Sequence, residues 1–153
     1  MRYTVRSKMA KEFTSTFSRL YGVYFKGKVQ IEVEEDGYRL YYINGEPSAL
    51  EVEGWVIPTL SFRSVVDRLP RVVVDMGAIS HICNGADVMA PGIVSSSVFT
   101  SGSVVVVVDE RYGKPLAIGV AVVDSAAGLE RGRVVKNLHY VGDAVWRRIK
   151  SFM

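Results

Sequence analysis

The residues suited to acid–base or nucleophilic chemistry are scattered along the chain. Asp75 and Asp87 lie twelve positions apart, and neither has a neighbouring nucleophile. His81 and Cys83 are two positions apart in a segment of helical character, where residues at that spacing point to different sides. The sequence nowhere places four potential metal ligands at the close spacing of a structural zinc site. We therefore expect no catalytic residue, no metal and no cofactor, and predict that the chain is not an enzyme.

A short glycine-containing segment is better suited to binding a ligand. Asn84, Gly85 and Ala86 are predicted to form a sharp turn, because glycine reaches positive φ angles without steric cost. Without a Cβ at Gly85, a nucleotide can approach the main chain and meet its N–H donors. The needs of the turn alone would also explain Gly85, and the two roles are compatible. We predict that this turn contacts a base or a phosphate.

Three residues that follow are further binding candidates. Pro91 and Gly92 form a turn pair, for which a structural role is the alternative and is favoured for Pro91. Met89 could present an apolar surface to a base, although a methionine beside a valine is more often part of a core. Asp87 is expected to accept backbone hydrogen bonds from the preceding turn.

Two other side chains have competing interpretations. His139, next to Tyr140, could stack on a nucleotide base. We favour packing of His139 between the last strand and the final helix. Cys83 is expected to be a small buried apolar residue. As the single cysteine, it can form no intrachain disulfide.

Basic side chains form a second candidate set. Arg131, Arg133 and Lys136 flank the last expected strand, and Arg131 and Arg133 have the spacing of residues on one face of a strand. The net charge is only +3, so it is informative only if basic residues gather on one face. We predict that these three residues contact phosphates, with ordinary solvated surface as the alternative for each. Other basic residues are expected on a hairpin and on the final helix: Arg111, Lys114, Arg147, Arg148 and Lys150.

The elements that position these residues begin with a helix and a small sheet. Met9, Phe13, Phe17 and Leu20 recur at intervals of three or four, which predicts a helix over 7–20. Alternating apolar and polar residues predict strands, and Asp-Gly and Asn-Gly pairs predict the tight turns between them. The expected strands are 29–33, 38–43 and 55–57, with a serine-capped helix over 61–69. This first half is predicted to be α+β.

The second half is richer in valine and is interrupted by glycines. Five consecutive valines, 104–108, indicate a strand buried on both faces. Strands are expected at 71–74, 103–109, 115–123 and 133–138, and short helices at 77–83, 125–130 and 142–151. Short strands joined by small turns favour a compact mixed β-barrel. We place the boundary at Pro70-Arg71, giving domains 1–70 and 71–153.

Membrane insertion and secretion are not indicated. The longest apolar run, 104–108, is far shorter than the roughly 20 residues that a membrane helix needs. The N-terminal sequence MRYTVRSKMAKEF lacks the apolar core of a signal peptide. We expect a cytoplasmic protein with no membrane partner.

Three stretches carry a resemblance to a known family. They are VVVDMGAISHICNGADVMAPGIV at 72–94, LAIGVAVVDS at 116–125 and GRVVKNLHYVGDAVW at 132–146. Together they resemble the PUA domain, named for pseudouridine synthases and archaeosine transglycosylases. The resemblance covers residues 71 to about 150, and implies an RNA-binding pseudo-barrel with short helices.

The combination with an α+β leader is similar to a narrower group, the archaeal relatives of the malignant T-cell-amplified and ligatin-type translation factors. There a pre-PUA domain precedes the PUA domain. This resemblance implies binding to the small ribosomal subunit and to the CCA end of tRNA. A separate SUI-type initiation factor is a further expected partner, because this chain lacks that domain. Ala90 departs from the family pattern, since many translation-type relatives have a basic residue there.

Two other functions stay open at this point. PUA domains often accompany RNA-modifying enzymes, so the chain could be an accessory subunit for tRNA or rRNA modification. A free-standing enzyme is disfavoured, because the first 70 residues contain no cysteine, no histidine and no phosphate-binding glycine loop. The chain could also be an assembly module whose barrel contacts protein, since fold alone does not determine function.

Overall fold

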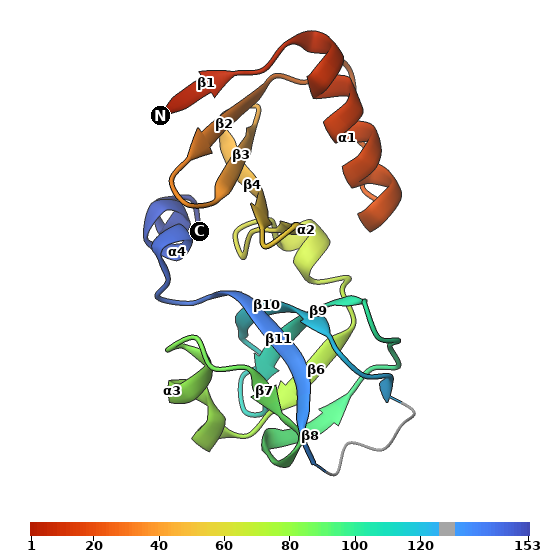
Figure 1. Cartoon of the computed structure of the whole chain (residues 1–153), viewed down its shortest axis with the longest axis vertical. Coiled ribbons are helices and arrows are strands. Elements are labelled where there is room, and N and C mark those ends of the chain that lie inside the picture. Colours follow the sequence, from red (N-terminus) through yellow and green to blue (C-terminus); the bar gives the residue numbers. More distant parts are fainter. Residues whose placement is uncertain (126–130) are drawn as a thin grey trace.

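A computed structural model describes residues 1–125 and 131–153. Figure 1 shows two parts stacked along the long axis of the molecule, which we call the leader (residues 1–70) and the barrel (residues 71–141). The predicted helical turn at 125–130 lies, apart from Ser125, outside the described residues. No helix in the described ranges is long and apolar enough to span a bilayer.

The leader contains a five-stranded antiparallel sheet of order β1-β2-β3-β4-β5 with two helices. Its elements are β1 (Arg2–Thr4), α1 (Ser7–Tyr21), β2 (Ile31–Glu35), β3 (Arg39–Ile43), β4 (Glu46–Val52), β5 (Trp55–Pro58) and α2 (Arg63–Val66). The predicted α+β class is confirmed, and both tight turns are present at positive φ, 74° at Gly37 and 85° at Gly45. The short strand β1 was not predicted, and β4, which follows the Asn44-Gly45 turn, was given no bounds.

The predicted helix over 7–20 is confirmed as α1, but it packs through only part of the expected stripe. Phe17 is fully buried, and its ring stacks on Phe62 with centroids 5.8 Å apart. Phe13 stacks on Tyr41 at 4.2 Å. The predicted positions Met9 and Leu20 are instead about half exposed, at 54% and 53%. The buried stripe is rotated toward Ala10 and Tyr21, because the sheet meets the helix on that side.

The serine-capped helix over 61–69 was wrong in its start and its length. Helix α2 covers only Arg63–Val66, and its N-cap is Phe62. The Ser61 hydroxyl donates to the carbonyl of Pro47 at 3.0 Å, so it is tied to strand β4 and cannot cap the helix.

The barrel is a nearly closed six-stranded mixed sheet of order β7-β11-β10-β9-β6-β8. Its strands are β6 (Arg71–Val74), β7 (Val88–Met89), β8 (Ile93–Ser96), β9 (Val104–Asp109), β10 (Pro115–Ala121) and β11 (Arg133–Tyr140). Strands β6 and β9 pair in parallel and the other pairs are antiparallel. Short helices interrupt it: η1 (Met76–Ala78), α3 (Ile79–Ile82) and η2 (Ala90–Gly92). The predicted barrel class is confirmed, and residues 105–108 are buried on both faces of β9.

One glycine is required by close packing inside the barrel. Gly119 lies at a register shift between β10 and β11. A Cβ at this position would come within 2.4 Å of the Lys136 carbonyl oxygen and 2.5 Å of a Val135 methyl group. The bulge therefore depends on glycine, which lets the two strands approach at this point.

The C-terminal helix α4 (Ala144–Ile149), continued by η4 (Lys150–Phe152), lies against the leader (Figure 1). Arg148 pairs with Glu34 of β2. One apolar cluster joins the leader, the barrel and α4. Its residues include Leu40, Leu50, Ile57 and Leu60 of the leader, Val106, Ile118 and Leu138 of the barrel, and Val145 and Ile149 of α4. The division of the chain at 70/71 thus stays a prediction, because leader and barrel share one core.

His139 is fully buried within this shared core. Its Nε2 accepts a hydrogen bond from the Leu60 N–H at 3.1 Å, so its ring proton lies on Nδ1 and is donated to Asp143 at 2.9 Å. Asp143 also caps α4 by accepting the Trp146 N–H. Burial opposes ionisation of Asp143, yet the hydrogen bonds from His139 and the backbone hold its pKa below the usual range. The packing interpretation of His139 is confirmed.

Replacing His139 should destabilise the whole chain. His139→Ala leaves the Leu60 N–H and the Asp143 carboxylate without their partner and opens a cavity. We expect a loss of about 2–4 kcal/mol in the free energy of unfolding, measured by urea denaturation at neutral pH. His81→Ala is the control, because His81 is the other histidine and is exposed. Equal effects of the two substitutions would contradict the role given to His139.

Candidate nucleic-acid interface

The segment before the predicted turn is built on Asp75. The Asp75 Oδ1 accepts the Ala78 N–H at 2.9 Å and so caps η1, which continues into α3. Ile82 of α3 is buried against the barrel, while His81 is exposed. Cys83 is half-buried, and burial raises the pKa of its thiol, which disfavours a reactive thiolate. In the described part of the chain, no group of three His, Cys, Asp or Glu could hold a metal ion.

The backbone N–H groups of Asn84, Gly85 and Ala86 all donate hydrogen bonds to α3. Those of Asn84 and Ala86 donate to the His81 carbonyl at 3.1 and 3.0 Å, and that of Gly85 donates to the Ile82 carbonyl at 3.0 Å. The expectation that these donors meet a ligand therefore needs revision, because each is already bonded to a carbonyl group of α3. What the turn presents to solvent is the side chains of Asn84 and Ala86.

Gly85 is held in place by conformation and by a neighbour. Its φ is +95°, which residues other than glycine rarely adopt. An added Cβ would also lie 3.2 Å from the Tyr140 hydroxyl oxygen. The structural alternative for Gly85 is therefore sufficient to explain the residue.

Asp87 anchors the turn to β11, and the prediction that it caps the preceding turn is wrong. Its Oδ1 accepts the backbone N–H of Asn137 at 2.9 Å, and its Oδ2 lies 3.3 Å from Arg133. The Asn137 side-chain amide donates to the carbonyls of Ile82 and Ala86, both at 3.0 Å. Asn137 was not among the predicted site residues. Only its place in the family-like ending GRVVKNLHYVGDAVW pointed to it.

Strand β7 turns Met89 outward. Met89 lies opposite Arg133 and is 49% exposed, whereas its neighbour Val88 is buried. The core interpretation of Met89 is therefore wrong, since the short strand alternates its faces. Ala90 is only 2% exposed and packs in the barrel core, so this position presents no charge.

In the Pro91–Gly92 turn, one residue is exposed and the other is hydrogen-bonded within the barrel. Pro91 is exposed at the start of η2. The carbonyl of Gly92 accepts the Asp75 N–H at 2.9 Å, and a Cβ on Gly92 would touch that of Ala78 at 3.4 Å. Gly92 thus closes the barrel wall next to α3, and Pro91 is the accessible member of the pair.

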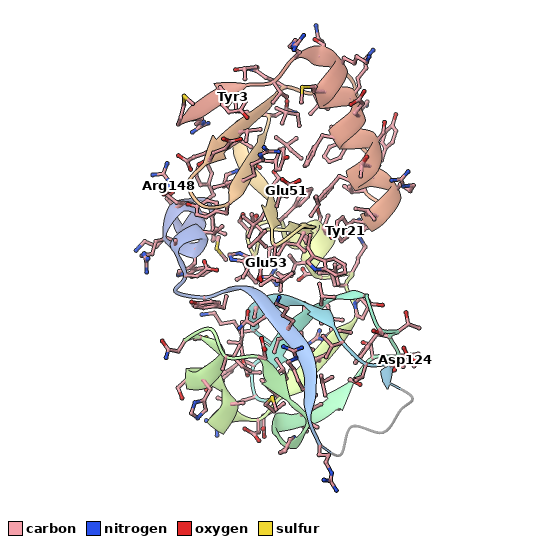
Figure 2. All side chains as sticks on the ribbon, viewed as in Figure 1. Tyr3, Tyr21, Glu51, Glu53, Asp124 and Arg148 are labelled. Carbon is pink, nitrogen blue, oxygen red and sulfur yellow. The ribbon has the colours of Figure 1, made fainter. Side chains whose placement is uncertain are left out.

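The three predicted basic residues do not form one cluster. Arg131 is exposed but precedes β11, so the shared strand face does not apply. Arg133 pairs with Asp87, and Lys136 pairs with Glu53 of the leader at 2.9 Å. Figure 2 places Glu53 at the junction between leader and barrel. These ion pairs are exposed, so each contributes little to stability.

The predicted residues that stay accessible come from the turn after α3, from β7 and η2, and from the start of β11 and the residues just before it. They are Asn84, Ala86, Met89, Pro91, Arg131 and Arg133. We call this set the β7–β11 face. It combines an apolar side chain, an amide and two guanidinium groups, which suits contacts to bases and phosphates. Lys136 lies at the junction with the leader instead.

Comparison with known proteins identifies the family of the chain. The PUA domain family matches residues 70–141, and a domain of unknown function, DUF1947, matches residues 1–63. An uncharacterized protein of Methanocaldococcus jannaschii is 43% identical over 79% of this chain and 76% of its own length. Malignant T-cell-amplified sequence 1 of Danio rerio is 36% identical over 79% and 71%. The chain belongs to the same family of PUA-domain proteins as these two relatives.

Further relatives of the family agree over most of the chain. Translation machinery-associated protein 20 of Saccharomyces cerevisiae is 28% identical over 94% of this chain and 85% of its own length. The crystal structure of a PUA-domain protein from Aeropyrum pernix, solved with tartrate, superposes with a TM-score of 0.82. It is 30% identical, and the match covers 98% of this chain and 91% of that one. The names of these relatives describe no enzymatic activity.

Gly85→Ala should destabilise the turn more than conformation alone requires. The substitution forces a side chain into positive φ, at a cost of about 1–2 kcal/mol, and pushes against Tyr140. We expect urea denaturation to show a larger loss than in Gly27→Ala. Gly27 is the matched control, because its φ is +74° and a Cβ added there would meet nothing within 4 Å. Identical losses would show that Tyr140 does not restrict this position.

Proposed function

We propose that this chain is a non-enzymatic RNA-binding protein of the translation apparatus. It contacts the small ribosomal subunit, the CCA end of tRNA, or both, and works in the cytoplasm. The observation that carries the proposal is the PUA match over 70–141 in a chain whose relatives are named for translation. A separate SUI-type initiation factor completes the proposed set of partners.

The β7–β11 face is the proposed contact surface. Met89 is free to pack on a base, and Asn84 can hydrogen-bond to a base edge or to the sugar. Arg131 and Arg133 supply positive charge that Ala90 does not. Gly85, Gly92 and Lys136 act through structure in this proposal, by fixing the turn, the barrel wall and the junction with the leader.

A titration with tRNA tests the partner. We expect the chain to bind tRNA that carries its CCA end more tightly than the same tRNA trimmed of it, and to sediment with small subunits in a low-salt gradient. Equal affinity for both tRNAs together with absence from the subunit fractions would refute the proposal. Copurification with an RNA-modifying enzyme instead of ribosomes would favour an accessory role in modification.

Substitution of the two arginines tests the surface. Arg131→Ala with Arg133→Ala should weaken tRNA binding and flatten its salt dependence by about 0.7–0.9 in the logarithmic slope for each phosphate that is no longer bound. Filter binding across a range of salt concentrations measures both. Arg39→Ala with Arg63→Ala is the control, because it removes the same number of exposed arginines from the leader, where each is in an exposed ion pair, as Arg133 is in the barrel. Unchanged binding by the first pair would remove it from the site.

A further inference from the structure

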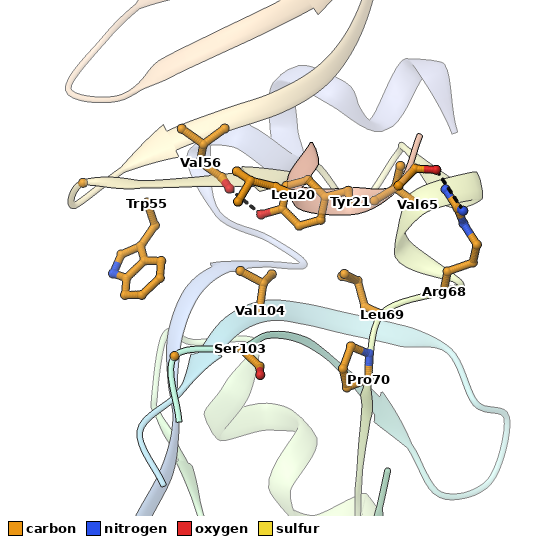
Figure 3. Close-up of a pocket in the computed structure, with 13 residues that line it drawn as sticks. Leu20, Tyr21, Trp55, Val56, Val65, Arg68, Leu69, Pro70, Ser103 and Val104 are labelled. Atoms are coloured by element: carbon orange, nitrogen blue, oxygen red, sulfur yellow. Dashed lines mark hydrogen bonds between the residues drawn. The ribbon is translucent and has the colours of Figure 1, made fainter. Parts of the chain in front are cut away.

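A pocket of about 630 Å³ opens where the leader meets the barrel, away from the β7–β11 face. The end of α1, the turn before β5 and the end of α2 form its leader side, and residues 102–104 form its barrel side. Figure 3 shows Leu69 and Val104 pointing up toward Leu20 and Tyr21. Its volume falls within the range of about 300–1,000 Å³ that is usual for small-ligand sites.

The first feature that suggests a ligand is an accessible aromatic ring. Trp55 starts β5, the edge strand of the leader sheet, and remains 37% exposed at one end of the pocket. Leu20, also lining the pocket, is 53% exposed. A flat indole opposite aliphatic side chains favours a planar ring as occupant, because a nucleobase can stack on an aromatic face.

The second feature is a fixed positive charge. Arg68 lines the other end of the pocket (Figure 3), and its Nε and Nη1 donate to the carbonyls of Ser64 at 2.9 Å and Gly22 at 3.4 Å. A guanidinium has five N–H donors, and three of those of Arg68 make no hydrogen bond to the described chain. The adjacent Asp67 is paired with Arg63 instead.

The charge of the pocket is not balanced by an acid. Its lining residues, all within the described ranges, include no Asp or Glu, and Arg68 makes no ion pair to the described carboxylates. Tyr21 stays neutral, because burial raises its pKa, and its hydroxyl donates to the Val56 carbonyl. The pocket thus complements a ligand with a flat apolar part and a negative charge.

We infer that this pocket binds a single nucleotide, with the base against Trp55 and the phosphate at Arg68. Such a nucleotide is either an unpaired residue of RNA or free in solution. The first source rests on the proposed function and adds a second contact to it. The second source is independent of that function.

Fluorescence of Trp55 tests the pocket directly. Trp146→Phe leaves Trp55 as the single tryptophan. In this background we expect saturable quenching by adenosine 5′-monophosphate and by an eight-residue adenosine RNA. Tighter binding of the RNA would identify RNA as the source, and equal affinity a free nucleotide. Adenosine without phosphate should bind about tenfold more weakly, because it cannot bind Arg68 through a phosphate.

Two variants separate the contributions of ring and charge. Arg68→Gln should weaken nucleotide binding about tenfold, whereas Arg19→Gln, an exposed arginine at the end of α1 outside the pocket lining, should not. Trp55→Leu should weaken it by a similar factor in equilibrium dialysis with labelled nucleotide, since stacking is lost. Thermal unfolding of each variant checks that the fold is retained.

The outcomes separate this inference from the proposed function. If neither nucleotide nor RNA changes Trp55 emission while the chain still binds tRNA, the pocket inference is overturned and the proposed function stands. If the nucleotide quenches Trp55 but neither tRNA nor subunits are bound, the inference stands with a free nucleotide. Quenching by an acidic phenylalanine-containing peptide, but not by nucleotides, would overturn it in favour of a protein partner.

Discussion

The rest of the structure depends on buried His139, which joins the leader, the barrel and α4. It extends from the last barrel strand, accepts the Leu60 N–H of the leader and donates to Asp143, the cap of α4. Around it, one apolar cluster runs without interruption from the leader sheet through the barrel to α4. The leader sheet has an apolar face, and such a face must be buried against another layer. The barrel buries it, so the leader and the barrel form one core.

This shared core fixes both candidate surfaces in space. Strand β11 carries His139 on its buried side, and two residues earlier Asn137 holds the turn after α3 through the Ile82 and Ala86 carbonyls. The β7–β11 face is thus anchored to the same strand that binds the leader. The nucleotide pocket lies at the edge of the same junction, where the cluster gives way to Leu69, Val104 and the exposed Trp55.

Charge is distributed by pairing rather than by a continuous basic stripe. Arg133 and Lys136 each have a carboxylate partner, Asp87 and Glu53. Such exposed pairs contribute little to stability, and they hold each cation beside a carboxylate. With a net charge of only +3, the proposed phosphate contacts depend on individual arginines and not on a basic stripe.

The sequence by itself determined the classes and the order of the elements. Turn residues such as Asp36-Gly37 and the valines of 104–108 report local conformation and burial, which depend on near neighbours. The PUA-like stretch at 72–94 likewise identified the barrel. The prediction of a serine-capped helix at 61–69 was wrong because the Ser61 hydroxyl donates to the carbonyl of Pro47, which is distant in the sequence and close only in space.

Tertiary structure alone decided how those elements serve a site. The N–H donors of the turn at 84–86 are used internally, Asp87 turns to β11, and Met89 faces solvent. The roles of Asp87 and Met89 do not follow from spacing, because each depends on a strand about 50 residues further along the chain. The pocket between Trp55 and Arg68 could not be predicted from the sequence either. Its walls come from four separate segments that only the shared core brings together.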